Sequence, residues 1–200
     1  MPLRGSTDLD YTWYGVLVTD CDALLVLEKC LKGELAHIPR RPHDSERTRL
    51  IKSGSIFVYE SNASGIKRWT DGINWSPSRI LTNFLVYHEL EKAPPPGEKK
   101  RAIKRKRSET EFDDQDPKTA QRTLIEEEWT DDDRRLMGSP QDNYGWKAGG
   151  LVKKTYSFDF RGASHHIISY FNPEDVRSGD LKRPIHCKTF QETFIRPELI

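Results

Sequence analysis

Two neighbouring runs decide the fold of this chain: Gly54-Ser55-Ile56-Phe57-Val58-Tyr59-Glu60 and Gly65-Ile66-Lys67-Arg68-Trp69-Thr70-Asp71-Gly72-Ile73-Asn74-Trp75-Ser76-Pro77-Ser78-Arg79. The consecutive apolar positions of the first run predict a strand that is covered on both faces. The second run predicts a basic-aromatic strand followed by a turn, because Asp71-Gly72 is a strong turn signal. Ser76-Pro77 is typical of a helix start, with serine at the N-cap and proline at the first helical position.

The second run also gathers arginine, tryptophan and hydroxyl side chains in one loop. Such a loop is poorly suited to a core and well suited to contact with a polyanion. The alternative interpretation is that Trp69 and Trp75 are core aromatics beside solvated Arg68 and Arg79. The clustering favours nucleic-acid contact, but the residue types alone leave both interpretations open.

Hydrophobic periodicity predicts further elements on either side of these runs. Residues 11–18 are expected to form a strand, and residues 45–52 a short basic helix or turn. A helix that begins at Asp20 or Asp22 and ends at Gly33 is expected to bury Leu24, Leu25, Leu27, Cys30 and Leu31. A second helix, starting at Pro77, is expected to place on one face Ile80, Leu81, Phe84, Leu85 and either Tyr87 or His88.

Residues 92–144 have a different composition from the rest of the chain. Pro94-Pro95-Pro96-Gly97 interrupts any regular element, and acidic blocks follow at 109–116 and 126–133. Like-charge runs resist compaction, so this segment is predicted to be a disordered insert anchored at most by Trp129 and by Leu136-Met137. Its basic run resembles a nuclear localisation signal, with a solvated charge run as the alternative; the basic residues are Lys99, Lys100, Arg101, Lys104, Arg105, Lys106 and Arg107.

The chain after the insert predicts a β-hairpin. Residues 151–160 and 164–171 alternate as strands, Arg161-Gly162 supplies the turn, and Pro173 opens a short helix or turn. An isolated hairpin is barely stable in water, so it must pair with the first half of the chain. We therefore expect one α+β domain, in which residues 11–91 and 145–190 share a mixed, mainly antiparallel sheet with flanking helices.

Composition and motif spacing argue against several classes of protein. The chain has no apolar run of 18 residues and no apolar signal core near Met1, so neither a membrane span nor secretion is expected. Its three cysteines fit neither a metal motif nor a disulfide framework, which indicates a reducing cytosol or nucleus. His165 and His166 are adjacent on a predicted strand and point to opposite faces, so they cannot chelate one metal ion together. No catalytic motif and no cofactor-binding loop is recognisable, and we expect no enzyme activity.

Local charge supports an anionic partner better than the total charge does. The formal net charge is only +1, but residues 40–79 contain eight Lys or Arg against four Asp or Glu. Residues 146–200 contain nine against six. Both predicted halves of the domain therefore carry a local positive excess, which attracts phosphate groups.

The chain resembles the WOPR-domain (Gti/Pac) family of fungal DNA-binding transcriptional regulators. The resemblance covers roughly residues 11–91 and 145–187. It is most specific in two motifs of the first block, Gly65-Ile66-Lys67-Arg68-Trp69-Thr70-Asp71-Gly72 and Trp75-Ser76-Pro77-Ser78-Arg79. In the second block it is carried by Gly150-Leu151-Val152-Lys153-Lys154-Thr155 and by 165–171. Two positions depart from the family pattern: Thr82 stands where relatives usually have glycine, and Ile73 where many have a basic residue.

The resemblance implies sequence-specific binding of double-stranded DNA in the nucleus, at an AT-rich promoter element, by a regulator of fungal morphology, development or nutrient response. It also marks Thr70 as a candidate site for a cyclic-AMP-dependent kinase. The alternative is a protein-interaction module of a nuclear regulator that docks an acidic partner peptide. A steep salt dependence would distinguish DNA binding from this alternative.

Roles for the candidate DNA-binding residues follow from their chemistry and from the resemblance. Arg49, Lys52, Lys67, Lys153 and Lys154 are expected to bind phosphates. The loop from Arg68 to Arg79 is expected to read the duplex, with an arginine in the narrow minor groove of AT-rich DNA. Within that loop Trp69 and Trp75 would brace the Asp71-Gly72 turn, and hydroxyl hydrogen bonds to the DNA would come from Thr70, Ser76 and Ser78.

Overall fold

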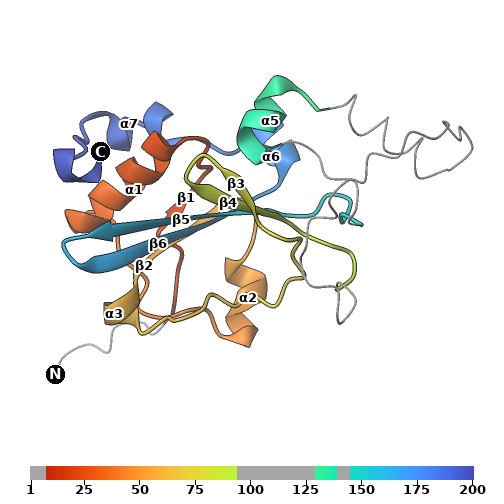
Figure 1. The fold of residues 1–200 in the computed structure, drawn as a ribbon, viewed down its shortest axis with the longest axis horizontal. Coiled ribbons are helices and arrows are strands. Elements are labelled where there is room, and N and C mark those ends of the chain that lie inside the picture. Colours follow the sequence, from red (N-terminus) through yellow and green to blue (C-terminus); the bar gives the residue numbers. More distant parts are fainter. Residues whose placement is uncertain (1–7, 94–128, 139–144) are drawn as a thin grey trace, which may run out of the picture.

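A six-stranded antiparallel sheet runs through the molecule in the order β1-β2-β6-β5-β4-β3 (Figure 1). The computed structural model describes residues 8–93, 129–138 and 145–200. The strands are β1 Trp13–Tyr14, β2 Ser55–Glu60, β3 Arg79–Leu81, β4 Phe84–His88, β5 Val152–Phe160 and β6 Ala163–Phe171. The helices are α1 Asp20–Leu31, α2 Asp44–Leu50, α3 Ser61–Ser64, α5 Asp131–Met137, α6 Pro173–Arg177, η1 Pro184–His186, α7 Lys188–Gln191 and η2 Pro197–Leu199.

The two halves of the chain interleave in this sheet. Strand β2 of the first half pairs with β6 of the second, with Phe57 opposite Ile168. Strand β4 of the first half pairs with β5 of the second, with Leu85 opposite Thr155. The prediction of one α+β domain with a sheet shared by both halves is therefore confirmed, although every strand pair in the described residues is antiparallel and the sheet is not mixed.

Each face of the sheet has its own hydrophobic core, and Figure 1 shows different helices on the two sides. Helices α1, α5, α6 and α7 lie on one side, called here the α1 face; α2 and α3 lie on the other, the α2 face. Alternation along β2 sends Ile56 and Val58 to the α1 face and Phe57 and Tyr59 to the α2 face. This double burial explains why the first run reads as continuously apolar.

Helix α1 agrees closely with its prediction. Thr19 and Asp22 form a capping box at its start, and Gly33 follows its end with a φ of 76°. Four of the five leucine and cysteine side chains expected to point inward are buried, while Leu31 is only partly covered. The same Asp22 is completely buried and pairs with Arg183 at 2.9 Å, which ties the C-terminal segment to the helix.

The predicted helix from Pro77 is wrong, because this segment forms the hairpin β3–β4. Ser76 does not cap a helix: its hydroxyl accepts a hydrogen bond from the backbone N–H of His88 at 3.0 Å. The side chains of Phe84, Val86 and His88, spaced two residues apart, point to the α1 face. In an apolar run this short, the sequence pattern alone does not distinguish a strand from a helix. Pairing of β4 with β5 decides between the two conformations.

Three further predictions need correction. The expected strand over 11–18 is limited to β1, and residues 65–74 form no strand. Residues 129–138 of the insert are not disordered, since they contain α5, but their anchors are the predicted ones: Leu136 and Met137 are buried, and the ring centroid of Trp129 lies 5.6 Å from that of Trp146. The basic run 99–107 lies outside the described residues. The strand at 55–60 and the hairpin of β5 and β6 are confirmed, with a φ of 50° at Arg161 and 80° at Gly162.

No helix within residues 8–93, 129–138 and 145–200 is long and apolar enough to cross a membrane.

The turn between β3 and β4 places Thr82 in the left-handed region, with a φ of 54°. A β-branched residue is strained in this conformation, whereas glycine adopts it without steric cost. The strain is partly offset by hydrogen bonds to Asp20, from the Thr82 hydroxyl at 3.1 Å and from the Asn83 amide at 2.9 Å.

We predict that Thr82→Gly raises the free energy of unfolding by roughly 0.5–1 kcal/mol, because relief of the strained φ exceeds the value of one exposed hydrogen bond. The midpoint of urea denaturation measures this change. Thr82→Asn is the matched control, since asparagine tolerates the same φ and retains a polar side chain. A lower midpoint for the glycine variant would mean that the bond to Asp20 outweighs the strain.

Candidate nucleic-acid interface

The buried carboxylate of Asp71 organises the loop of residues 65–78. Its Oδ1 atom accepts hydrogen bonds from Trp75 Nε1 at 2.9 Å and from the Ile73 backbone N–H at 3.2 Å. Its Oδ2 atom accepts from Lys153 Nζ at 2.9 Å and from the Tyr170 hydroxyl at 2.7 Å. One carboxylate therefore joins the loop to strands β5 and β6.

Electrostatics around Asp71 favour its charged form. Burial by itself would raise the pKa of Asp71, but the charge of Lys153 and the donated side-chain hydrogen bonds outweigh burial and lower it. Burial, together with the adjacent carboxylate, raises the pKa of Tyr170 well above its ordinary value. The network is thus an ionised carboxylate held by a neutral phenol and an ammonium group.

The two tryptophans of the loop brace it from inside. Trp69 Nε1 donates to the Tyr170 hydroxyl at 2.6 Å, and the Trp69 ring stacks on Tyr59 at 5.9 Å with an interplanar angle of 10°. The Trp75 ring lies 4.4 Å from the ammonium group of Lys153. Both indoles therefore face the sheet, as expected of bracing side chains.

Gly72 allows the close approach between this loop and α2. Its φ is 76°, and a Cβ atom there would lie 2.8 Å from Nη1 of Arg47. A side chain at this position would therefore both strain the backbone and displace the arginine.

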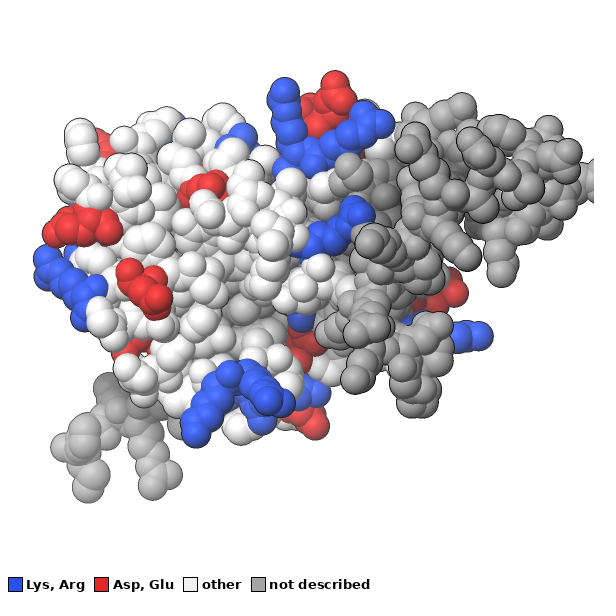
Figure 2. Space-filling view, in the orientation of Figure 1, with Lys and Arg blue, Asp and Glu red and all other residues white. Residues whose placement is uncertain are grey.

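The outer side of the same loop is polar and basic. Lys67, Arg68 and Thr70 are exposed, and Arg41 donates a hydrogen bond to the Thr70 hydroxyl at 2.5 Å. A cavity of about 510 Å³ lies between residues 40–41 and residues 64–68. It is lined by Arg40, Arg41, Ser64, Gly65, Ile66, Lys67 and Arg68. Figure 2 shows Lys and Arg side chains gathered along the lower edge of the molecule, over the chain between α3 and α2.

Arg40 and Arg41 are functional candidates that sequence reasoning did not single out. Arg40 is held in place by a bidentate pair with Glu46, at 2.7 and 2.8 Å, and this pair lowers the pKa of Glu46 to about 2. The available signal in the sequence was the adjacent arginine pair itself. Its placement beside Lys67 and Arg68 follows from tertiary packing.

The predicted phosphate-binding residues other than Lys67, which is exposed on the loop, fall into three groups. Arg49 and Lys52 are exposed near the end of α2, where Arg49 donates to the Leu9 carbonyl at 2.8 Å. Lys153 is buried in the Asp71 network. Lys154 is only 1% exposed on the α1 face, where it donates to the Val18 carbonyl at 3.1 Å and burial lowers its pKa to about 8. These positions argue against direct phosphate contacts by Lys153 and Lys154.

Arg79 and the two serines also lie apart from the exposed basic side chains. Arg79 pairs across the hairpin with Val86, so its side chain starts on the α1 face, opposite to Arg68. Ser76 is buried against β4, whereas Ser78 is exposed. Sequence proximity therefore does not make the stretch from Arg68 to Arg79 one contact surface.

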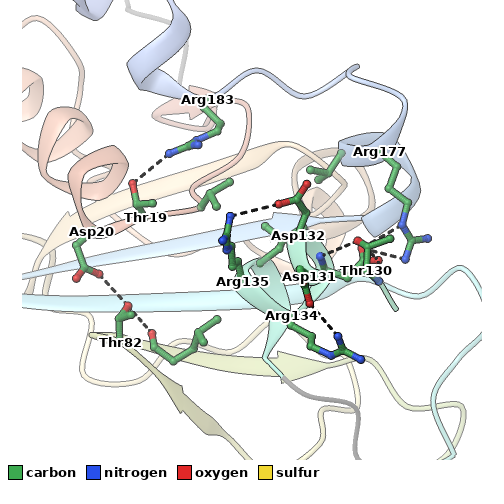
Figure 3. Close-up of a pocket in the computed structure, with 15 residues that line it drawn as sticks. Thr19, Asp20, Thr82, Thr130, Asp131, Asp132, Arg134, Arg135, Arg177 and Arg183 are labelled. Carbon is green, nitrogen blue, oxygen red and sulfur yellow. Dashed lines mark hydrogen bonds and ion pairs between the residues drawn. The ribbon is translucent and has the colours of Figure 1, made fainter. Parts of the chain in front are cut away.

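A cavity of about 1090 Å³ lies on the α1 face between α1, α5 and the β3–β4 turn (Figure 3). Its charged side chains neutralise one another in pairs, including Arg134 with Asp131 at 3.0 Å and Arg177 with Asp133 at 3.0 Å. This balance is unfavourable for a polyanion. Within the described parts of the chain, no three His, Cys, Asp or Glu side chains are grouped so as to hold a metal ion.

Fold and site thus define an α+β domain with a braced basic loop, and solved structures share its fold. The structure of the WOPR domain of Wor1 from Candida albicans in complex with a 13 bp double-stranded DNA superposes with a TM-score of 0.63. It is 30% identical in sequence and aligns with 96% of this chain and 95% of that one. The complex of the same domain with a 17 bp DNA gives a TM-score of 0.62 at 31% identity, over 96% of this chain and 97% of that one.

The chain belongs to the Gti1/Pac2 family, whose model matches residues 12–172. It is 48% identical to the global transcription regulator sge1 of Fusarium oxysporum f. sp. lycopersici, over 99% of this chain and 64% of that protein. It is 37% identical to the transcriptional regulator MIT1 of Saccharomyces cerevisiae, over 88% of this chain and 31% of that protein. The chain therefore spans less than two thirds of the length of these relatives.

We predict that Lys153→Met lowers the free energy of unfolding by roughly 3–5 kcal/mol at neutral pH, because it leaves the Asp71 carboxylate buried without its cation. Since the pKa of Asp71 is lowered in the native protein, the stability that Asp71 contributes is present at neutral pH and is lost on acidification below about pH 4. The difference between wild type and variant should therefore shrink as the pH falls. Urea denaturation from pH 7 to 3 measures it.

Lys154→Met is the matched control for this prediction. It removes a neighbouring ammonium group that is also buried, and for which no carboxylate lies at ion-pair distance among the described residues. A smaller loss of stability is expected. Equal losses for the two lysine variants, or a Lys153→Met deficit that grows on acidification, would contradict the assigned role of the Asp71 pair.

Proposed function

We propose that this chain is the DNA-binding part of a transcriptional regulator and binds double-stranded DNA sequence-specifically through the basic side of the 65–78 loop. The observation that carries the proposal is the exposed pair of Lys67 and Arg68, on a loop fixed from inside by Asp71, with Arg41 beside it on the segment before α2. Preorganised cations lose little conformational entropy when they meet phosphate groups. The named activities of the relatives and the duplexes in the related complexes support the proposal.

In the proposed complex the basic side chains divide between two tasks. Arg41, Lys67, Arg49 and Lys52 lie on the α2 side and bind backbone phosphates, which sets the register of the protein on the duplex. Arg68 enters the minor groove of an AT-rich element, where a narrow groove concentrates negative potential. Lys153 acts indirectly, through its pair with Asp71.

The cellular setting is part of the proposal. A DNA-binding regulator acts in the nucleus, and the basic run 99–107 has the composition of an import signal. The regulated programme is fungal morphology, development or nutrient response, as the family resemblance implies.

Binding-site selection from random duplexes, followed by anisotropy titrations at several salt concentrations, tests the proposal. We predict that Arg68→Ala weakens binding to the selected duplex by roughly 1–3 kcal/mol and weakens binding to a random duplex less. Arg135→Ala is the matched control, because Arg135 is equally exposed but lies on α5, on the other face. It should leave both affinities nearly unchanged.

Two outcomes would count against this assignment. Equal losses on selected and random duplexes would make Arg68 a phosphate contact and not a reader of sequence. Absence of duplex binding, with salt-sensitive binding of an acidic peptide instead, would favour a protein-interaction module.

Regulation at Thr70 by a cyclic-AMP-dependent kinase also remains a proposal. We predict that Thr70→Glu lowers duplex affinity at least about tenfold, which is roughly 1.4 kcal/mol. A negative charge there repels the duplex and also engages Arg41, whose guanidinium already contacts the Thr70 hydroxyl.

Titrations of wild type, Thr70→Ala and Thr70→Glu at two salt concentrations separate these effects. If the charge repels the duplex directly, the loss of affinity in Thr70→Glu should be smaller at high salt. If the charge acts by capturing Arg41, the additional variant Arg41→Ala should largely remove the difference between Thr70→Glu and wild type. Unchanged binding by Thr70→Glu at both salt concentrations would exclude Thr70 from the interface.

A further inference from the structure

The hairpin β3–β4 exposes apolar side chains on the same side of the sheet as the basic loop. Ile80 is 82% exposed and Leu85 is 37% exposed, and the two are paired directly across the hairpin. The pairs Leu85–Thr155, Thr155–Ile168 and Ile168–Phe57 continue this row across the sheet. Phe57 belongs to the core of the α2 face, so Ile80 and Leu85 also point to that face.

This apolar row leads directly into the proposed DNA site. A groove of about 430 Å³ separates the loop from the sheet, and Thr155 lines it together with Arg68 and Trp69. Ile80 lies two strands beyond Thr155, a distance of about 10 Å at the usual strand spacing. The exposed apolar pair and the exposed basic loop therefore form one continuous surface.

The tip of the hairpin is also held firmly. The Thr82 hydroxyl and the Asn83 amide both donate hydrogen bonds to the Asp20 carboxylate at the start of α1. Ile80 and Leu85 together form an exposed apolar pair on this fixed hairpin, and contact with a partner would remove apolar surface of both from water. Because the row continues into the basic groove, the partner that fits is the one that the loop binds.

We propose that Ile80 and Leu85 contact the 5-methyl groups of thymines in the major groove, next to the minor groove that receives Arg68. This inference rests on the proposed function. The major groove admits a two-stranded β-ribbon, and the thymine methyl group is its apolar feature. An AT-rich element offers such methyl groups close together. Contacts in adjacent major and minor grooves by two parts of one domain are an established docking geometry.

Replacement of thymine by deoxyuridine tests this contact, since it removes the methyl group and retains base pairing and the minor-groove pattern. The probe is the selected duplex, with its thymines replaced singly and then together. For the wild-type chain each contacted methyl group should contribute about fourfold in affinity, the equivalent of about 0.8 kcal/mol per buried carbon. Thymines outside the contact should contribute nothing.

Variants of the hairpin complete the test. Ile80→Ala and Leu85→Ala should each weaken binding to the thymine duplex about as much as deoxyuridine substitution weakens binding of the wild type. On the deoxyuridine duplex, the variants and the wild type should bind with the same affinity. Ile80→Thr retains a β-branched strand residue and guards against misfolding. Ile185→Ala is the matched control, because Ile185 is 44% exposed but lies in η1, which packs with α1; it should behave like wild type.

The outcomes separate this inference from the function on which it rests. Equal binding of thymine and deoxyuridine duplexes by the wild type would overturn the methyl contact and leave DNA binding intact. A loss in Ile80→Ala that persists on the deoxyuridine duplex would also overturn it. No binding to any duplex would reject the proposed function itself.

Discussion

The buried ion pair between Asp71 and Lys153 is the constraint on which the candidate site depends. A charge taken out of water is costly unless it is paired and hydrogen-bonded, so these two side chains tolerate few other arrangements. The pair fixes Trp75 through its indole N–H and Tyr170 through its hydroxyl. The network therefore also fixes the backbone that carries the exposed cations Lys67 and Arg68, although neither side chain takes part in the network.

Because of this network, the conformation of the site also depends on the complete sheet. Asp71 belongs to the first half of the chain, whereas Lys153 and Tyr170 lie on strands of the second half. The loop can therefore adopt its conformation only after β5 and β6 have entered the sheet between β2 and β4. Folding and assembly of the basic surface become one cooperative event, and the long segment between the halves adds only a logarithmic entropic cost.

The two faces of the sheet differ in how their charged side chains are arranged. On the α2 face, Arg41, Lys67 and Arg68 lie close together on exposed chain. On the α1 face, Arg and Asp side chains around the large cavity pair with one another (Figure 3). A polyanion is attracted by the first arrangement and gains little from the second.

Local patterns in the sequence determined a large part of the fold. The capped helix α1, the doubly covered strand β2 and the hairpin around Arg161-Gly162 were all predictable, because short-range sterics and periodicity specify each of them. The segment 77–88 was not, since its apolar spacing suits a helix or a hairpin and only pairing with β5 selects one. Helix α5 was missed because its charges resemble those of a disordered segment.

The sequence by itself determined the central part of the site: a basic, aromatic and hydroxyl-rich loop with a turn at Asp71-Gly72. The tertiary structure alone decided which way the side chains point. Lys153 and Lys154 are neighbours in sequence, yet strand alternation buries one beneath the loop and the other beneath α1. A side chain's face depends on the register of strands that are distant in sequence, and no local pattern records that register.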